Sequence, residues 1–267
     1  MKLAIFGYPF SHTDQASFDF GRNAKTEVFY FPTIFQAFEA VEKGETEGGI
    51  VPYENSTRGA VFETLDELFD REGVHITGLK EREIHQCLLG LKEAEISDIK
   101  SVISHPQALA QSRRKLSKEA SGVVFEPRSS TALAAREVFE TKDPSLAAIG
   151  SQELANHLGL KVLLSHLEEA ENRTKFVFIS KKAFDPKAPH TGMVFWFSAD
   201  KAGNLAKLLT FLADKSLNLT KLDSRRAPAK YGGYIFFIDV AAPLEYVQSL
   251  GYDLETLVEG YKILGTY

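Results

Sequence analysis

The chain has 267 residues and a formal charge of −5, because 31 lysines and arginines face 36 aspartates and glutamates. This length and a hydrophobic fraction of 44% are typical of one large globular domain or two smaller ones. The charge balance, without a run of Lys or Arg, argues against general binding to nucleic acid or to an anionic membrane.

The composition also limits the kinds of site. The single cysteine, Cys87, excludes an intrachain disulfide framework and a Cys-based zinc site. The seven histidines form no HExxH or similar helical pair, so their spacing predicts no metal site. No segment reaches the roughly 20 apolar residues of a membrane helix, and the N-terminus turns polar too soon for a signal peptide. We therefore expect a cytoplasmic protein.

The first part of the chain, residues 1–182, alternates short apolar runs with helical periods. Strands are predicted at residues 3–6, 49–51, 86–89, 102–103, 123–125 and 176–179. Helices are predicted from residue 11, at 33–44, from 61, at 106–116 and at 132–139. This alternation predicts an α/β fold with a mostly parallel sheet.

A linker is predicted at residues 181–190, where two prolines stand among charged and small residues. After it, strands are predicted at 193–197, 217–223, 234–240 and 261–264, with helices from 203 and at 244–258. The order βαββαβ is that of a ferredoxin-like module. Such a module leaves a sheet edge and a helix pair available for dimerisation.

Four predicted strands end in turns that carry hydroxyl or amide side chains. The turns are Ser11-His12-Thr13, Asn55-Ser56-Thr57, Ser104-His105 and Ser129-Ser130-Thr131. In an open parallel sheet such turns gather at the carboxyl edge, where free helix N-terminal amides attract anions. Any one turn is better explained as an ordinary helix cap, but the four together favour an anion-binding cleft.

A further polar segment, residues 172–176, precedes the last predicted strand of the first part. Here a hydroxyl, Thr174, stands between the cations Arg173 and Lys175. Together, the hydroxyl and the cations beside it could protonate a leaving group and hold a carboxylate. The alternative is a polar turn whose cations are solvated.

Several motifs in this order resemble those of the bacterial prephenate dehydratase family. They are VPYENSTRG at 51–59, SHPQALAQ at 104–111, STALAA at 130–135, AIGS at 148–151 and NRTKF at 172–176. The final part of the chain resembles the ACT regulatory domain that this family carries. The resemblance covers nearly the whole chain, and the run at 104–111 is long and specific.

The resemblance implies a catalytic region at residues 1–182 that is bilobed, like type II periplasmic binding proteins, and an ACT domain at 190–267. Lobe one would span about 1–78 and 166–182, and lobe two about 79–165. It further implies decarboxylation and dehydration of prephenate to phenylpyruvate, in L-phenylalanine biosynthesis, with neither a metal nor an organic cofactor. The chain would form a homodimer or homotetramer through its ACT and catalytic domains.

The resemblance also assigns roles to residues. Thr174 would assist departure of the ring hydroxyl, Lys175 would supply a cation, and Phe176 would orient the triplet and line the pocket. Lys175 stands where the family has arginine, so it keeps the charge without the bidentate geometry. The substrate would be bound by Ser11, Asn55, Ser56, Thr57, Ser130 and Thr131.

L-Phenylalanine would act as an effector at the ACT domain. Its binding residues would be Gly203, Asn204, Leu205, Ala206, Asn218, Leu219, Asp223, Ser224 and Arg225. The segments 203–206 and 223–226 depart from the family's Gly-Ala-Leu-Val and Glu-Ser-Arg-Pro. Two alternatives stay open, an arogenate dehydratase and a non-catalytic binding protein that senses an amino acid.

Overall fold

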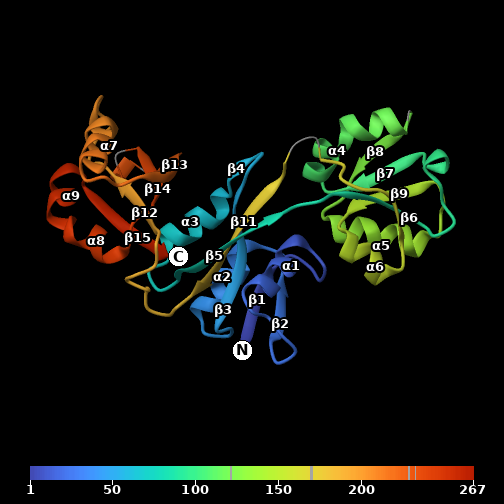
Figure 1. Cartoon of the computed structure of the whole chain (residues 1–267), viewed down its shortest axis with the longest axis horizontal. Coiled ribbons are helices and arrows are strands. Elements are labelled where there is room, and N and C mark those ends of the chain that lie inside the picture. The colour runs from blue at the N-terminus through green and yellow to red at the C-terminus, as the bar shows by residue number, and fades with distance from the viewer. Residues whose placement is uncertain (121, 169–170, 228, 232) are drawn as a thin grey trace.

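A computed structural model of the chain describes residues 1–120, 122–168, 171–227, 229–231 and 233–267. Its strands form one ten-stranded and one five-stranded sheet, which confirms the predicted mixed α/β class. Figure 1 shows the C-terminal unit at one end, the N-terminal lobe in the middle and a second lobe at the other end. In the part of the chain that is described, no helix is long and apolar enough to cross a membrane.

The N-terminal lobe, lobe one, supplies six of the ten strands of the larger sheet. Its elements are β1 (Lys2–Phe6), α1 (His12–Asp19), β2 (Glu27–Phe31), α2 (Ile34–Glu42), β3 (Gly48–Asn55), β4 (Gly59–Ala60), α3 (Phe62–Asp70), β5 (His75–Glu83) and β11 (Arg173–Ser180). Strand β1 pairs parallel with β2 and β3, whereas β11 lies antiparallel between β3 and β5. Strands β1, β2, β3 and β5 therefore run in one direction, which agrees with the predicted mostly parallel sheet. Strand β11 runs against them, because the chain leaves on β5 and returns beside it on β11.

Helix α2 illustrates how the sequence specifies an element. Thr33 caps it, since its hydroxyl oxygen accepts a hydrogen bond from the Gln36 amide at 3.2 Å. The predicted apolar face, Ile34, Ala37, Phe38 and Val41, is buried against the sheet.

The second lobe, lobe two, holds the smaller sheet, whose strand order is β10-β6-β9-β7-β8. Its elements are β6 (Cys87–Gly90), the 3-10 turn η1 (Ile96–Asp98), β7 (Ser101–Ser104), α4 (Pro106–Glu119), β8 (Val124–Pro127), α5 (Thr131–Thr141), β9 (Leu146–Gly150), α6 (Gln152–Leu158) and β10 (Lys161–Leu164). Strands β7, β8 and β9 are parallel, while β6 and β10 pair antiparallel. Cys87 is buried in the apolar core of this lobe.

Two crossover segments connect the lobes, one from β5 to β6 and one from β10 back to β11. They are hydrogen-bonded to each other, with Ile84 N donating to Asn172 O at 2.7 Å and Leu167 N to Gln86 O at 2.9 Å. The first crossing was expected near residue 78. In the structure β5 stays paired with β11 through Glu83, so the crossing comes later.

The C-terminal unit has the predicted βαββαβ order. Its elements are β12 (Thr191–Trp196), α7 (Asn204–Asp214), β13 (Leu219–Arg226), the 3-10 turn η2 (Ala229–Tyr231), β14 (Tyr234–Val240), α8 (Leu244–Ser249), α9 (Gly251–Leu257) and β15 (Gly260–Thr266). The antiparallel order β13-β14-β12-β15 is that of a ferredoxin-like module.

This unit packs directly on lobe one and continues its sheet. Strand β15 joins β5 where Gly265 lies opposite Ile76. The Lys262 ammonium group donates to three carbonyl oxygens at the C-terminal end of α3, at 2.7–2.9 Å. At the centre of the contact, the buried Tyr53 hydroxyl donates to Asp239 Oδ1 at 2.8 Å. The two units therefore share polar contacts as well as an apolar core.

Candidate active site

A cavity of about 560 Å³ lies between lobes one and two. Lobe one contributes the turn after β1, the end of β3 and the start of β11. Lobe two contributes the N-terminal turns of α4 and α5. The polar lining residues of the cavity include Ser11, His12, Thr13, Asn55, Glu63, Gln86, His105, Gln107, Gln111, Ser129, Ser130, Thr131, Asn172 and Thr174. The cavity thus gathers every residue of two of the four predicted polar turns and one residue, Asn55 or His105, from each of the other two.

Three helices begin at the cavity wall. Ser11 caps α1 by accepting from the Asp14 amide, and Ser130 caps α5 by accepting from the Leu133 amide, at 3.2 and 3.1 Å. His105 caps α4 through Nδ1, 3.3 Å from the Gln107 amide. Each helix end presents free backbone N–H groups and a partial positive charge, which favours a bound anion.

Thr174 lies in the wall of the cavity, where it is 8% exposed. Its position is set by pairing between β11 and β3, which brings Thr174 opposite Asn55. The Asn55 amide nitrogen donates to Thr174 Oγ1 at 2.9 Å. Because that oxygen already accepts a hydrogen bond, the Thr174 hydroxyl proton is available to a ligand in the cavity.

Asn55 is itself held from several sides. Its amide nitrogen also donates to Asn172 Oδ1 at 2.7 Å, and its carbonyl oxygen accepts from the amide and hydroxyl groups of Thr57. The Thr57 hydroxyl oxygen in turn accepts from Gln111 Nε2 at 2.9 Å, a contact from lobe one to lobe two. Asn55 therefore orients Thr174 within a network that spans both lobes.

Two predicted substrate-binding residues lie outside the cavity lining that the described residues form. Ser56 is exposed, and its hydroxyl group bonds the Glu171 carbonyl and the Arg173 amide. Thr57 supports Asn55, as described above. Both residues hold the turn after β3 against the return crossover, so the structure gives them supporting contacts.

Lys175 also lies away from the cavity. Alternate residues of a strand face opposite sides of the sheet, so Thr174 and Phe176 line the cavity while Lys175 points to the other face. There its ammonium group donates to Glu54 at 3.0 Å. The expected cation of the cleft is therefore engaged elsewhere. The described lining residues include no Lys or Arg, and Glu63 adds a carboxyl group, so the groups available to bind an anion are neutral donors and helix ends.

Phe176 is almost fully buried and supplies an apolar wall. Next to this region stands His12, whose pKa burial lowers to about 4, so its imidazole is neutral at neutral pH. The Nε2 atoms of His12 and Gln86 lie 3.4 Å apart. The cavity thus combines an apolar surface, neutral hydrogen-bonding groups and one carboxyl group, that of Glu63.

Three lining residues, Gln86, Gln107 and Gln111, belong to none of the predicted polar turns and lie outside the segment 172–176. A signal existed for two of them. Gln107 and Gln111 are four residues apart, so they share one face of the helix that the sequence predicted. Gln86 carried no such signal, because it reaches the cavity only through the path of the crossover.

Comparison with known proteins decides the family. A sequence model of prephenate dehydratases matches residues 3–184. A prephenate dehydratase from Methanocaldococcus jannaschii is 37% identical over 245 residues, which cover 90% of this chain and 88% of the relative. The chain belongs to the prephenate dehydratase family.

The similarity to solved structures includes the C-terminal unit as well as the two lobes. Prephenate dehydratase from Arthrobacter aurescens, solved in complex with L-Phe, has a TM-score of 0.91 and 27% identity, covering 100% of this chain and 90% of that one. The quorum-quenching acylase GqqA has a TM-score of 0.86 and 27% identity, covering 100% and 97%. The second similarity shows that proteins described by different activities share this fold.

The residues predicted to bind an effector fall into two groups in this family member. Gly203, Asn204, Leu205 and Ala206 form the start of α7, and Asn204 and Leu205 line a small cavity of about 50 Å³. Asn218 and Leu219 lie at the start of β13, and Asp223, Ser224 and Arg225 lie farther along it.

The second group makes contacts of its own. Asp223 accepts from Lys221 at 2.5 Å, and Arg225 lies 2.5 Å from Asp66 on α3 of lobe one. Among the described residues, the small cavity includes no member of this group. The structure therefore does not bring the two groups into one cavity within a single chain.

Proposed function

We propose that this chain converts prephenate to phenylpyruvate. The observation that carries the proposal is the Thr174 hydroxyl, held by Asn55 in a cavity that three helix N-termini surround. Prephenate has two carboxylates and a ring hydroxyl. Loss of one carboxylate as carbon dioxide leaves its bonding electrons to the ring, which becomes aromatic as the C–O bond to the hydroxyl group breaks. The hydroxyl group takes up one proton from the solvent and leaves as water. No oxidant or reductant is consumed.

The arrangement of groups matches the needs of this reaction. The N-terminal amides of α1, α4 and α5 suit the carboxylates, because each helix end favours negative charge. Phe176 offers an apolar surface to the ring. Thr174 donates a hydrogen bond to the departing hydroxyl group, and preorganised donation of this kind stabilises charge that develops in the transition state. Lys175 contributes indirectly, by fixing Glu54 and the pairing of β3 with β11.

Purified full-length protein should form phenylpyruvate from prephenate without added metal. Parallel assays with arogenate distinguish the related dehydratase, which would release phenylalanine directly. If saturating protein leaves both substrates at their background rates of decay, the proposed activity is wrong. Stabilisation by prephenate without turnover would instead identify a binding protein.

We further propose that residues 190–267 are an ACT domain that binds L-phenylalanine and regulates the catalytic region, residues 1–182. The ferredoxin-like topology of this unit supports the assignment, as does the L-Phe complex of the A. aurescens relative. We expect Gly203–Ala206 to bind the effector together with the groups of β13, across a homodimer or homotetramer. We also expect a cytoplasmic location.

The regulatory proposal has its own test. Sizing with and without L-phenylalanine gives the assembly state, and initial rates over an L-phenylalanine titration give the response. Asn204→Ala is expected to weaken the response while leaving basal turnover unchanged, because Asn204 lies outside the cavity between the lobes. A wild-type response in this variant would remove Asn204 from the effector site.

A further inference from the structure

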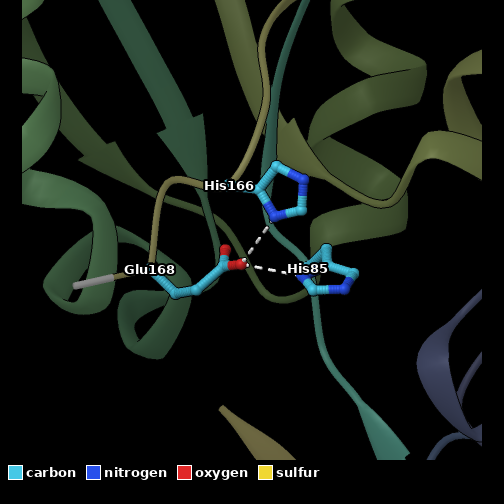
Figure 2. Close-up of side chains that lie close together, drawn as sticks. All are labelled: His85, His166 and Glu168. Carbon is cyan, nitrogen blue, oxygen red and sulfur yellow. Dashed lines mark hydrogen bonds and ion pairs between the residues drawn. The ribbon is translucent and has the colours of Figure 1, made fainter. Parts of the chain in front are cut away.

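His85, His166 and Glu168 form a cluster where the two crossovers meet. His85 lies on the outgoing crossover, whereas His166 and Glu168 lie on the returning one (Figure 2). Both imidazole rings face the same carboxylate oxygen, Glu168 Oε1, at 2.8 Å from His85 Nδ1 and 3.4 Å from His166 Nδ1. We propose that these three side chains bind one divalent transition-metal ion such as Zn²⁺.

The spacing of the donor atoms suits such an ion. One ligand atom from each residue can be chosen so that all lie within 4.8 Å of one another. Zinc bonds to imidazole nitrogen and carboxylate oxygen are about 2.0–2.2 Å long, and tetrahedral ligands are then about 3.4 Å apart. A small movement of the His85 ring away from Glu168 therefore opens the space for the ion.

The donor set favours a transition metal over a hard cation. Imidazole nitrogen suits zinc, copper, iron and nickel, whereas magnesium and calcium prefer oxygen ligands. Two histidines and a glutamate make three protein ligands, and the exposed side chains of His85 and His166 leave further positions open to solvent. This is the ligand set of open zinc sites.

The surrounding contacts hold the ligands in place. Glu168 Oε2 accepts a hydrogen bond from the backbone N–H of Gln86 at 2.9 Å. The other nitrogen of His85 lies 3.5 Å from Glu83 Oε2. A second carboxylate in that position orients a metal-bound imidazole.

The backbone of His166 is also constrained. It has φ +55°, in the left-handed region, which is uncommon for a residue with a side chain. Lys115 Nζ donates to its carbonyl oxygen at 2.5 Å. This conformation costs free energy, and it directs the ring toward Glu168.

An ion at this position would connect the two crossovers. The same junction places Gln86 in the wall of the cavity between the lobes. Metal binding would therefore stabilise the relative position of lobes one and two that is seen in the structure. The spacing of the histidines along the chain predicted no metal site, because His85 and His166 are far apart in sequence and share no helix. Only the pairing of the crossovers brings them together.

The test uses full-length protein that has been treated with EDTA and dialysed, then titrated with ZnCl₂ in a calorimeter. We expect one ion per chain and a higher thermal unfolding midpoint with zinc present. Loss of a ligand in His85→Ala or His166→Ala should weaken binding by more than about 100-fold, and Glu83→Gln by about 10-fold or more, the effect of an orienting partner. Bound Co²⁺ should show the visible absorption of a four- or five-coordinate ion, which the ligand variants lose.

His157→Ala is the matched control, because His157 is an exposed histidine on α6 outside the cluster. It should bind zinc as the wild type does. Absence of a one-to-one zinc complex in the wild type would overturn the proposal. Equal zinc affinity in His85→Ala and the wild type would do the same. Because both ligand histidines are exposed, circular dichroism should show wild-type folding in their variants, and Glu168→Gln gives a third, independent measurement.

Discussion

Replacing Thr174 with valine removes one hydroxyl group from the cavity wall and leaves the shape of the side chain nearly unchanged. In the structure this group accepts from Asn55 Nδ2 at 2.9 Å and can donate its proton into the cavity. The variant therefore removes the proposed donor to the leaving hydroxyl group. The apolar wall and the helix N-termini remain.

The expected loss follows from the geometry. Removal of one preorganised donor to developing charge typically lowers kcat by about 10²–10³-fold, or about 2.7–4 kcal/mol. The effect on folding should be smaller, because Asn55 Nδ2 keeps the acceptors Asn172 Oδ1 at 2.7 Å and Arg173 O at 3.1 Å. With no donor left unsatisfied, we expect the free energy of unfolding to fall by about 1 kcal/mol.

The assay is steady-state formation of phenylpyruvate from prephenate, with urea unfolding measured on the same preparations. An interaction made only in the transition state should lower kcat and kcat/KM equally. Thr174→Ser keeps a hydroxyl and should retain much more activity than Thr174→Val. Thr220→Val, an exposed threonine on β13, is the control. Near-normal turnover in folded Thr174→Val would refute the assignment.

Three further predictions concern stability. Tyr53→Phe removes a donor to buried Asp239 and should lower the free energy of unfolding in urea by about 1–3 kcal/mol; an unchanged value would contradict this. Gly265→Ala places a Cβ 2.3 Å from the Ile76 carbonyl oxygen, and the overpacking should lower the thermal midpoint through a loss of about 1–3 kcal/mol; a wild-type midpoint would count against it. Burial lowers the pKa of His12 from 6.5 to about 4, so the unfolded chain binds more protons and stability should fall as pH drops through that window. His12→Gln should show a smaller fall in urea titrations across this range, and an equal fall would disprove the contribution of His12.

The sequence predicted the elements that have a strong local signal. Helix α2 has its cap and its apolar period, and β12 and β14 are continuous apolar runs. Strand β5 was missed because its second half, Lys80–Glu83, is charged and carries no alternating pattern. It forms because β11 pairs along its whole length, so the partner rather than the local sequence decides its conformation.

For the candidate site, too, the sequence predicted some features correctly and others wrongly. Polar turns after strands predicted an anion-binding cleft, and Ser11, Asn55 and Ser130 do reach one cavity. Lys175 was expected there as a cation. The two-residue period of a strand, applied to residues 174–176, would have placed it on the opposite face.

By itself, the sequence determined the mixed α/β class, the βαββαβ order of the C-terminal unit and the family, since these follow from local periodicity and contiguous motifs. Only the tertiary structure decided which way each strand side chain faces, where the chain crosses between lobes and which distant residues meet. His85 and Glu168 illustrate this, because they are brought to 2.8 Å by hydrogen bonds between two crossovers that are separate in sequence. Such contacts depend on backbone pairing across the whole fold, which no local pattern of residues encodes.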